Sequence, residues 1–498
     1  MAATYAFQRP GGPKLARNNV SPLPSPLIIS PATPPPTPTD ISDDLGFEHR
    51  VAVRPLRVII VGAGIAGLTL GTGLAQVGHD VTILEQVNEI AEVGAGIQIA
   101  PNAARILRRF GLLEEVLEYA NVMEKNSLRR YANDEELGTA PFMPEVEVKY
   151  GAPLAVIHRG DLQRILIRAA KSSGCYIVTS QKVIEADTAR GAHVQTADGT
   201  WYSGDVVFAA DGIKSTLRAQ IAAAYGITDS AIPTGDAAYR VLIPRETIQH
   251  DKEALAMLDQ NVGMRYMGPG GHVMAYPVRN NTLYNMVLLH PAQEHISHEA
   301  GESWTRKGNK AEMLDFYKDW SPLIRKLLSY VPEGEVLEWT LNSHAPLPRW
   351  VEGNIALVGD ACHPMLPYVA QGAANAIEDA GTLAAALTCT DDVRLALGVY
   401  EAVRKERGER IQASATAVRG SLHLEDGPEQ ERRDEAIRRS KGGKGDNPDL
   451  WADRKWQEYM WGVDVMRETI EEWEALAGKV NLRKEEHENV EFVKLETL

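Results

Sequence analysis

Four residues near the start of the apolar part of the chain have the types and spacing needed to bind a dinucleotide. Gly62, Gly64 and Gly67 form the pattern G-x-G-x-x-G directly after an apolar run, and Glu85 ends the next such run. The first glycine allows a tight turn, the second lets the backbone approach a pyrophosphate, and the third lets helix pack on strand. The carboxylate can bind a ribose diol. These residues predict a nucleotide site, but they do not distinguish FAD from NAD.

Two later segments place aspartates on glycine turns. Asp211 and Gly212 follow one buried apolar run, and Asp360 follows another. Gly372 and Ala373 then open an alanine-rich helix. An aspartate on such a turn can hold a flexible polyol such as ribitol, and the N-terminus of the helix can stabilise negative charge on a reduced flavin. The two segments therefore favour FAD.

The elements that must position these residues fall into five segments of different character. They are a proline-rich extension (1–56), a first nucleotide-binding part (57–235), a substrate-binding β-sheet domain (236–345), a second nucleotide-binding part (346–403) and a charged helical C-terminal region (404–498). In the middle segment, β-branched and aromatic runs between Tyr239 and Leu289 predict an antiparallel sheet. The predicted fold class is therefore α/β, with a Rossmann-like domain into which a β-sheet domain is inserted.

The N-terminal extension is expected to be disordered. It holds 11 of the 28 prolines, and it cannot bury enough apolar surface to offset the entropy lost on ordering. It carries no acidic residue before Asp40, which leaves an organellar targeting role open beside that of a dispensable tail. In the absence of a clear signal, a cytoplasmic location is expected.

Composition narrows the range of partners. The net charge of -15 argues against nucleic acid, because phosphate binding requires a basic face. The three cysteines lack paired spacing, so neither a disulfide framework nor a cysteine-rich metal site is expected. The longest apolar run is interrupted by glycines, so no membrane span is expected. We therefore expect a monomer or homodimer whose partner is a small molecule and which holds no metal.

The three motifs in this order resemble the flavoprotein aromatic hydroxylases, also called class A monooxygenases. The resemblance covers residues 57 to 390, and the Gly-Asp segment at Asp360 is its most specific part. Within that family the chain is most similar to the salicylate hydroxylase-like fungal branch, through segments 94–102, 158–163 and 450–461. The resemblance implies a GR2-type FAD-binding domain, NADH or NADPH as a transient co-substrate, and O2.

The family pattern assigns roles to individual positions. It implies that Glu85 holds the adenosine ribose, that Gly96 and Arg159 contact FAD, and that Asp360 holds the ribitol. Ala373 would lie beside the flavin ring. A further set would serve both FAD and NAD(P)H, namely Asp211, Gly212 and Arg218.

Substrate chemistry depends on the inserted sheet. In this family a flavin C4a-hydroperoxide delivers oxygen to an electron-rich ring, and a nearby cation helps to form the phenolate. By resemblance Arg240 and Tyr276 are the candidate catalytic residues, although Arg240 as a salt-bridged strand residue and Tyr276 as a core residue remain alternatives. His272 is a weaker candidate for substrate contact. His363 is interpreted as structural rather than as a base.

The sequence therefore predicts an FAD-dependent monooxygenase that hydroxylates a phenolic or aromatic-acid substrate, with loss of CO2 where a carboxylate is displaced. One alternative is epoxidation or dearomatising hydroxylation in a secondary-metabolite pathway. A second is a flavin-binding module without turnover. The tryptophan-rich tail at Trp451, Trp456 and Trp461 is expected to be a packing element, with a membrane or partner surface as the alternative.

Overall fold

The structure is a computed structural model that describes residues 45–90, 94–187, 191–292, 305–440 and 446–482. Most of the extension expected at residues 1–56 lies outside the described residues, and so do the hypotheses about disorder and targeting. Within residues 41–498, which form one compact unit, the elements are built around two large sheets.

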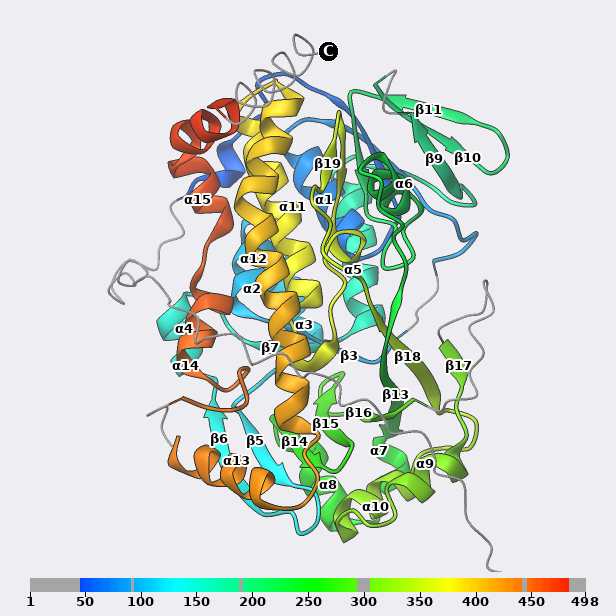
Figure 1. Cartoon of the computed structure of the whole chain (residues 1–498), viewed down its shortest axis with the longest axis vertical. Coiled ribbons are helices and arrows are strands. Elements are labelled where there is room, and N and C mark those ends of the chain that lie inside the picture. Colours follow the sequence, from blue (N-terminus) through cyan, green and yellow to red (C-terminus); the bar gives the residue numbers. More distant parts are fainter. Residues whose placement is uncertain (1–44, 91–93, 188–190, 293–304, 441–445, 483–498) are drawn as a thin grey trace, which may run out of the picture. The chain divides into compact units, whose positions relative to one another are not determined.

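A six-stranded sheet lies in the upper part of Figure 1, in the order β19-β20-β12-β1-β2-β8. Its strands are β1 (Arg57–Val61), β2 (Asp80–Leu84), β8 (Tyr176–Val178), β12 (Val206–Ala209), β19 (Val351–Glu352) and β20 (Ile355–Leu357). All neighbours are parallel except β19 and β20. In register, Val61 pairs with Ala209, and Ala209 pairs with Leu357. The three strands therefore end together, and the glycine-rich, Asp-Gly and Gly-Asp turns leave the same edge of the sheet.

Helices cover this sheet and set the directions of the turns. α1 (Ile65–Gln76) packs against α11 (Gly372–Cys389), and both begin at the edge where the turns meet. The other helices of this part are α2 (Pro101–Arg109), α3 (Leu113–Tyr119), α4 (Glu145–Tyr150), α5 (Arg159–Ser172), α6 (Thr216–Ala224) and the 3-10 turns η1 (Phe47–His49), η2 (Gly359–Ala361) and η3 (Pro367–Val369).

Two three-stranded sheets flank the six-stranded one. The first has the order β3-β7-β4, with β3 (Gly96–Ile99), β7 (Ala155–His158) and β4 (Asn121–Val122). The second has the order β11-β10-β9, with β9 (Val183–Asp187), β10 (Ala192–Thr196) and β11 (Trp201–Gly204). β3 brings Gly96 against the inserted sheet, where the Gly96 amide donates to Asn285 Oδ1 at 2.8 Å.

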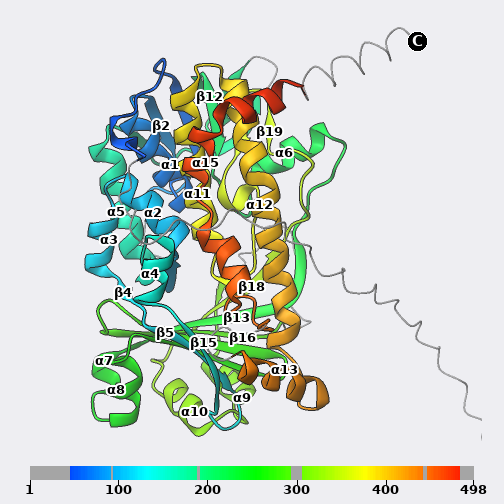
Figure 2. The ribbon, with the colours of Figure 1, turned by 90° about the vertical axis from the view of Figure 1, so that its left-hand side faces the viewer.

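An eight-stranded sheet lies below, in the order β17-β18-β13-β16-β15-β14-β5-β6, and Figure 2 shows it from the side. Its strands are β5 (Lys125–Arg130), β6 (Glu136–Pro141), β13 (Ile232–Pro244), β14 (Val262–Gly268), β15 (Gly271–Val278), β16 (Leu283–Pro291), β17 (Thr305–Lys307) and β18 (Leu337–Ser343). The helices of this part are α7 (Arg245–Ile248), α8 (Lys252–Leu258), α9 (Lys310–Phe316) and α10 (Pro322–Ser329). They share a second hydrophobic core with the sheet.

This sheet differs from the sequence-based expectation in two respects. β14 pairs with β5 in parallel, whereas the other neighbours are antiparallel. β5 and β6 come from residues 125–141, which the sequence analysis had assigned to the first nucleotide-binding part. KNSLRR is largely polar and ELGTAP contains a glycine and a proline, so neither shows the apolar alternation that identifies a strand.

The C-terminal region returns along both sheets. α12 (Val393–Leu422) packs on α11 and reaches the eight-stranded sheet, and α13 (Pro428–Arg439) lies beside β6 (Figure 1). α14 (Arg454–Gln457), the π-turn η5 (Glu458–Gly462) and α15 (Val465–Glu471) follow. The side chains of Trp451, Trp456 and Trp461 are all buried, as a packing role requires. Across the described ranges, we find no helix that combines the length and the apolar character needed to cross a bilayer.

Candidate active site

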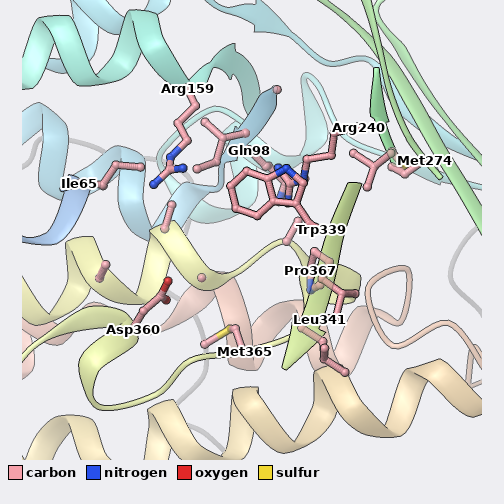
Figure 3. Close-up of a pocket in the computed structure, with 18 of the residues that line it drawn as sticks. Ile65, Gln98, Arg159, Arg240, Met274, Trp339, Leu341, Asp360, Met365 and Pro367 are labelled. Atoms are coloured by element: carbon pink, nitrogen blue, oxygen red, sulfur yellow. The ribbon is translucent and has the colours of Figure 1, made fainter. Parts of the chain in front are cut away.

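A cavity of about 630 Å³ opens where the edge of the six-stranded sheet faces the eight-stranded sheet. Figure 3 shows Arg159 and Asp360 toward one end of it and Arg240, Trp339 and Met274 toward the other. Ten of the fourteen residues predicted to bind the cofactors or to act in catalysis line this cavity: Gly64, Gly96, Arg159, Asp211, Gly212, Arg240, Tyr276, Asp360, Gly372 and Ala373. The structure thus brings together candidates that lie far apart in the sequence.

The glycines of the first motif divide into one that faces the cavity and two that pack behind it. A Cβ on Gly64 would meet nothing within 4 Å, so the backbone there is open to a ligand. A Cβ on Gly62 would lie 2.4 Å from Ala210 O, and one on Gly67 would lie 2.0 Å from Gly62 O. Gly62 and Gly67 are therefore needed for the close approach of the turn and the helix, although neither lines the cavity.

Glu85 also lies outside the cavity lining. It follows β2 directly, and its two carboxylate oxygens accept hydrogen bonds from the backbone amides of Ala63, at 2.8 Å, and Val87, at 3.0 Å. The first bond ties the carboxylate to the glycine-rich turn. Each oxygen retains a further lone pair, so the half-buried side chain can still accept from a ribose hydroxyl.

The Asp-Gly turn presents a partly satisfied carboxylate. Asp211 Oδ2 accepts from the amide of Thr216 at 3.0 Å, whereas Oδ1 is buried with no hydrogen-bond partner in the described part of the chain. Burial raises the pKa of Asp211. Gly212 has φ of +79°, a conformation that favours glycine. Asp211 and Gly212 both line the cavity, so this turn lies where a hydroxyl-rich ligand could bind.

Arg218 departs from its predicted role toward NAD(P)H. Its side chain is fully buried and pairs with Asp229 at 3.0 Å. It also donates to three backbone carbonyls, those of Ala345, Ala361 and Cys362. Four of its five N–H donors are used in this way, and the buried side chain does not line the cavity, so it is not placed to bind a transient co-substrate. Arg218 instead fastens the Asp-Gly helix to the Gly-Asp segment, a role that sequence spacing cannot reveal.

Asp360 and Arg159 lie across the cavity from one another (Figure 3). The Asp360 side chain is accessible from the cavity. The protein that surrounds the cavity nevertheless limits the solvation of this carboxyl group, and this burial raises the pKa of Asp360. Arg159 makes no side-chain hydrogen bond or ion pair with any described residue, so its guanidinium is available to an anion. A cation, an open glycine and two acceptor carboxylates fit the pyrophosphate and polyol of FAD.

A buried ionic cluster fixes the backbone of the Gly-Asp turn. Asp379 Oδ2 accepts from the amide of Gly359 at 2.8 Å and from His363 Nε2 at 2.7 Å, and its Oδ1 accepts from Arg404 at 2.8 Å. Glu378 pairs with Arg404 and with Arg407. His363 is fully buried and does not line the cavity, which agrees with its interpretation as structural.

Cys362, His363 and Asp379 could in principle hold a metal ion, because their ligand atoms all lie within 4.8 Å of one another. Both oxygens of Asp379 already accept hydrogen bonds, however, and Arg404 supplies the positive charge that this carboxylate needs. Asp379 is therefore satisfied without an ion, although His363 Nδ1 has no hydrogen-bond partner in the described part of the chain.

At the other end of the cavity, Arg240 is half-buried and has no counter-ion among the described residues. Its guanidinium lies over the Trp339 ring, 5.0 Å from the ring centroid, and its Nε has no hydrogen-bond partner. No acidic partner is found among the described residues, so the salt-bridge alternative does not hold there. Burial lowers the pKa of Arg240, although the neighbouring Tyr276 opposes this effect.

Tyr276 is both a core residue and a wall of the cavity. It is 8% exposed, and burial raises its pKa to about 12 against the opposing effect of Arg240. The phenol therefore stays protonated and can donate a hydrogen bond. A Cβ on Gly96 would lie 2.4 Å from the Tyr276 ring, so Gly96 is required for the close approach of this ring.

Several cavity residues were missed by sequence reasoning. They are Trp339, Met274, Phe142, Arg265 and Trp451. Arg265 is buried in a pair with Asp449 at 2.7 Å and lies 4.9 Å from the centroid of the Trp451 ring. The C-terminal region thus supplies part of the wall. Trp451 belongs to the tryptophan-rich tail that the sequence shows, but nothing in that tail indicated contact with a sheet formed by distant residues.

Comparisons with known proteins agree with this geometry. A family described as FAD binding domain matches residues 55–415. An FAD-dependent monooxygenase of Arthrinium sp, atnJ, is 36% identical over 419 residues, which are 83% of this chain and 95% of that protein. The 3-hydroxybenzoate 6-hydroxylase of Klebsiella oxytoca is 33% identical over 363 residues, or 72% of this chain and 86% of that protein. A solved salicylate hydroxylase substrate complex has a TM-score of 0.69 at 25% identity, covering 85% of this chain and 98% of that one.

Proposed function

The chain belongs to the FAD-binding family of flavoprotein monooxygenases, and from this premise we propose that it hydroxylates a phenolic or aromatic-acid substrate. The proposed co-substrates are NADH or NADPH and O2. FAD, once bound and reduced, supplies the activation of O2 from which one oxygen atom reaches the ring. The remaining chemistry is the task of the residues that line the cavity.

This proposal rests on Arg240, which has no acidic partner among the described residues. Arg240 lies in the part of the cavity that aromatic and aliphatic side chains line, and this part continues into the end where FAD is expected to bind. A guanidinium that lines a largely apolar cavity and has no acidic partner among the described residues favours an anionic ligand. Around it the wall is largely aromatic and aliphatic, with Trp339, Met274 and Val287 among its members. A flat ring with one negatively charged oxygen group fits both features.

Arg240 and Tyr276 have complementary parts in the reaction. The cation holds a carboxylate or phenolate, and for a phenol it favours ionisation, which makes the ring more electron-rich. Tyr276, protonated at neutral pH, can donate to the same oxygen. Arg240 lies over Trp339, and Tyr276 lies against Gly96. In these positions the two residues hold the substrate ring in place relative to the FAD end of the cavity.

Loss of CO2 is a second possible outcome of the same site chemistry. Where the attacked carbon carries a carboxylate, oxygen addition weakens the bond to that group, and the carboxylate leaves as CO2. Support for this branch comes from the likeness to the salicylate hydroxylase structure and from the capacity of Arg240 to hold a carboxylate.

Substrate-dependent oxidation of NADH and NADPH tests the proposal. FAD-loaded protein is mixed with a panel of phenols and phenolic acids while oxygen consumption and product masses are recorded. The expected result is stimulated oxidation with a product that has gained one oxygen atom, or that has lost CO net where CO2 is expelled. Full FAD content without stimulation by any member of the panel would exclude a phenolic substrate.

A further inference from the structure

A pair of histidines joins the substrate end of the cavity to the C-terminal region. His272, at the start of β15, lines the cavity and is 2% exposed. Its Nδ1 lies 2.8 Å from Nε2 of His423, the residue that ends α12. This distance is that of a hydrogen bond, so one ring donates and the other accepts.

A carboxylate lies on the far side of His423. Asp236 is fully buried, and it accepts from Arg419 Nε and Nη2, each at 2.5 Å, and from the Tyr368 hydroxyl at 2.5 Å. The Arg419 guanidinium is thus the counter-ion of this carboxylate. His423 Nδ1 lies 3.9 Å from Asp236 Oδ2 and has no hydrogen-bond partner in the described residues.

Both histidines are neutral at ordinary pH. Burial lowers the pKa of His423 to about 4, with Asp236 opposing this effect and Arg419 adding to it. Burial also lowers the pKa of His272, and the neighbouring His423 and Arg265 act in the same direction. Each ring therefore carries a single proton, and the question is which nitrogen holds it.

The charge of Asp236 answers that question. A proton on His423 Nδ1 is attracted by the carboxylate 3.9 Å away, whereas a lone pair there would face a negative charge. With its proton on Nδ1, His423 can only accept at Nε2, so His272 must donate from Nδ1. His272 Nε2 is then left with a lone pair on the cavity side of the ring.

We propose that His272 accepts a hydrogen bond from a hydroxyl group of the substrate, with His423 and Asp236 as positioning residues that fix its tautomer. The inference rests on the proposed function, because the substrate must occupy this cavity. It adds a requirement to that function. The substrate carries a hydroxyl donor for His272 as well as an anionic group for Arg240.

Heteronuclear NMR of the histidine ring nitrogens tests the tautomers without any substrate. Histidine-labelled, FAD-loaded protein is measured near neutral pH, and the two rings are assigned from the signals lost in His272→Gln and His423→Gln. Protons on Nδ1 of both rings are expected. A proton on Nε2 of either ring would overturn the proposal. Because the readout needs no turnover, its failure is distinguishable from failure of the proposed hydroxylation.

A matched ligand pair tests the contact itself. Binding of 3-hydroxybenzoate and of 3-methoxybenzoate, which lacks the donor, is followed by perturbation of the flavin spectrum. The wild type should prefer the hydroxyl compound by about tenfold, the worth of one hydrogen bond, and His272→Phe should lose this preference. His423→Gln should reduce the preference without removing any ligand contact. Equal binding of the two probes by the wild type, no binding of either, or an unchanged preference in His272→Phe would overturn the contact.

Discussion

Charged groups have different partners in two regions of the molecule, the buried cluster behind the Gly-Asp turn and the wall of the cavity. In the cluster, Asp379, Glu378 and Arg404 are fully buried, and each is held by an ion pair and further hydrogen bonds. On the wall, Arg159 and Arg240 have no acidic partner among the described residues. Charges that support the fold are satisfied within the chain, as Arg265 on the wall also is by Asp449, whereas Arg159 and Arg240 are left for a ligand. Changes in the cluster should therefore affect stability first, and changes in the wall should affect binding and turnover first.

The largest effect is expected from Asp379→Asn. The change leaves Arg404 and His363 without the carboxylate that they share, and breaking a buried pair on one side typically costs about 3 to 5 kcal/mol. Asparagine keeps only one acceptor oxygen, so either Arg404 or the Gly359 amide then faces an NH2 donor, and FAD content should fall together with the melting temperature. Thermal denaturation and flavin content measure both. The control Asp315→Asn removes an exposed pair with Lys318 and should change little. A stable Asp379→Asn with full FAD content would contradict the structural role of the cluster.

Trp451→Ala should show that the wall also has structural members. Trp451 is 2% exposed, packs edge-on against Phe142 and lies over Arg265. Truncation of a buried tryptophan costs about 3 kcal/mol or more, and here it also enlarges the cavity. Lower stability with better acceptance of bulkier phenols is expected from denaturation and from substrate-dependent oxidation rates. Trp201→Ala is the matched control, because that side chain is 46% exposed. An unchanged substrate range would show that Trp451 does not limit the chamber.

The FAD-binding part and the substrate wall also differ in how well the sequence predicts them. The glycine-rich, Asp-Gly and Gly-Asp motifs are short and local, so the FAD-binding fold and its convergent turns could be predicted. The substrate wall is built by contacts between distant segments. Trp339 lies next to Arg240 because β13 and β18 are neighbours, and no local pattern records that pairing. Arg218 belongs to a motif that is typical of ligand binding, yet its buried side chain binds Asp229 and backbone carbonyls instead.

Arg240→Met separates the two regions most directly. A charge-assisted hydrogen bond is worth about 1.5 to 3 kcal/mol, so kcat/KM should fall by about 10- to 100-fold. Stability should be unchanged or higher, because an unpaired, half-buried cation is removed. Substrate-dependent oxidation rates and thermal denaturation provide the two readouts. Arg245→Met, which removes an exposed pair with Asp259, is the control. Loss of stability without loss of turnover would place Arg240 with the structural charges.

The smallest effect is expected where the C-terminal region joins the FAD-binding part. Asp464 pairs with Arg109 at 2.6 Å, and although burial opposes it, this contact lowers the pKa of Asp464 to about 2. A depressed pKa adds stability that is complete above the unfolded-state value and is lost as the pH falls through the folded-state value. Relative to Asp464→Asn, the wild type should therefore gain about 2 kcal/mol near neutral pH, and the gain should vanish between about pH 4 and pH 2.

Urea denaturation across this pH range measures the difference, with the exposed Asp446→Asn as a control that should show none. The pair belongs to the satisfied class of charges even though it lies outside the cluster. Its effect should therefore appear in the free energy of unfolding and leave the affinity for the aromatic ligand unchanged. A pH-independent difference between wild type and Asp464→Asn would mean that packing, rather than charge, joins the C-terminal region to α2. The division between satisfied and unsatisfied charges would then hold for the active site alone.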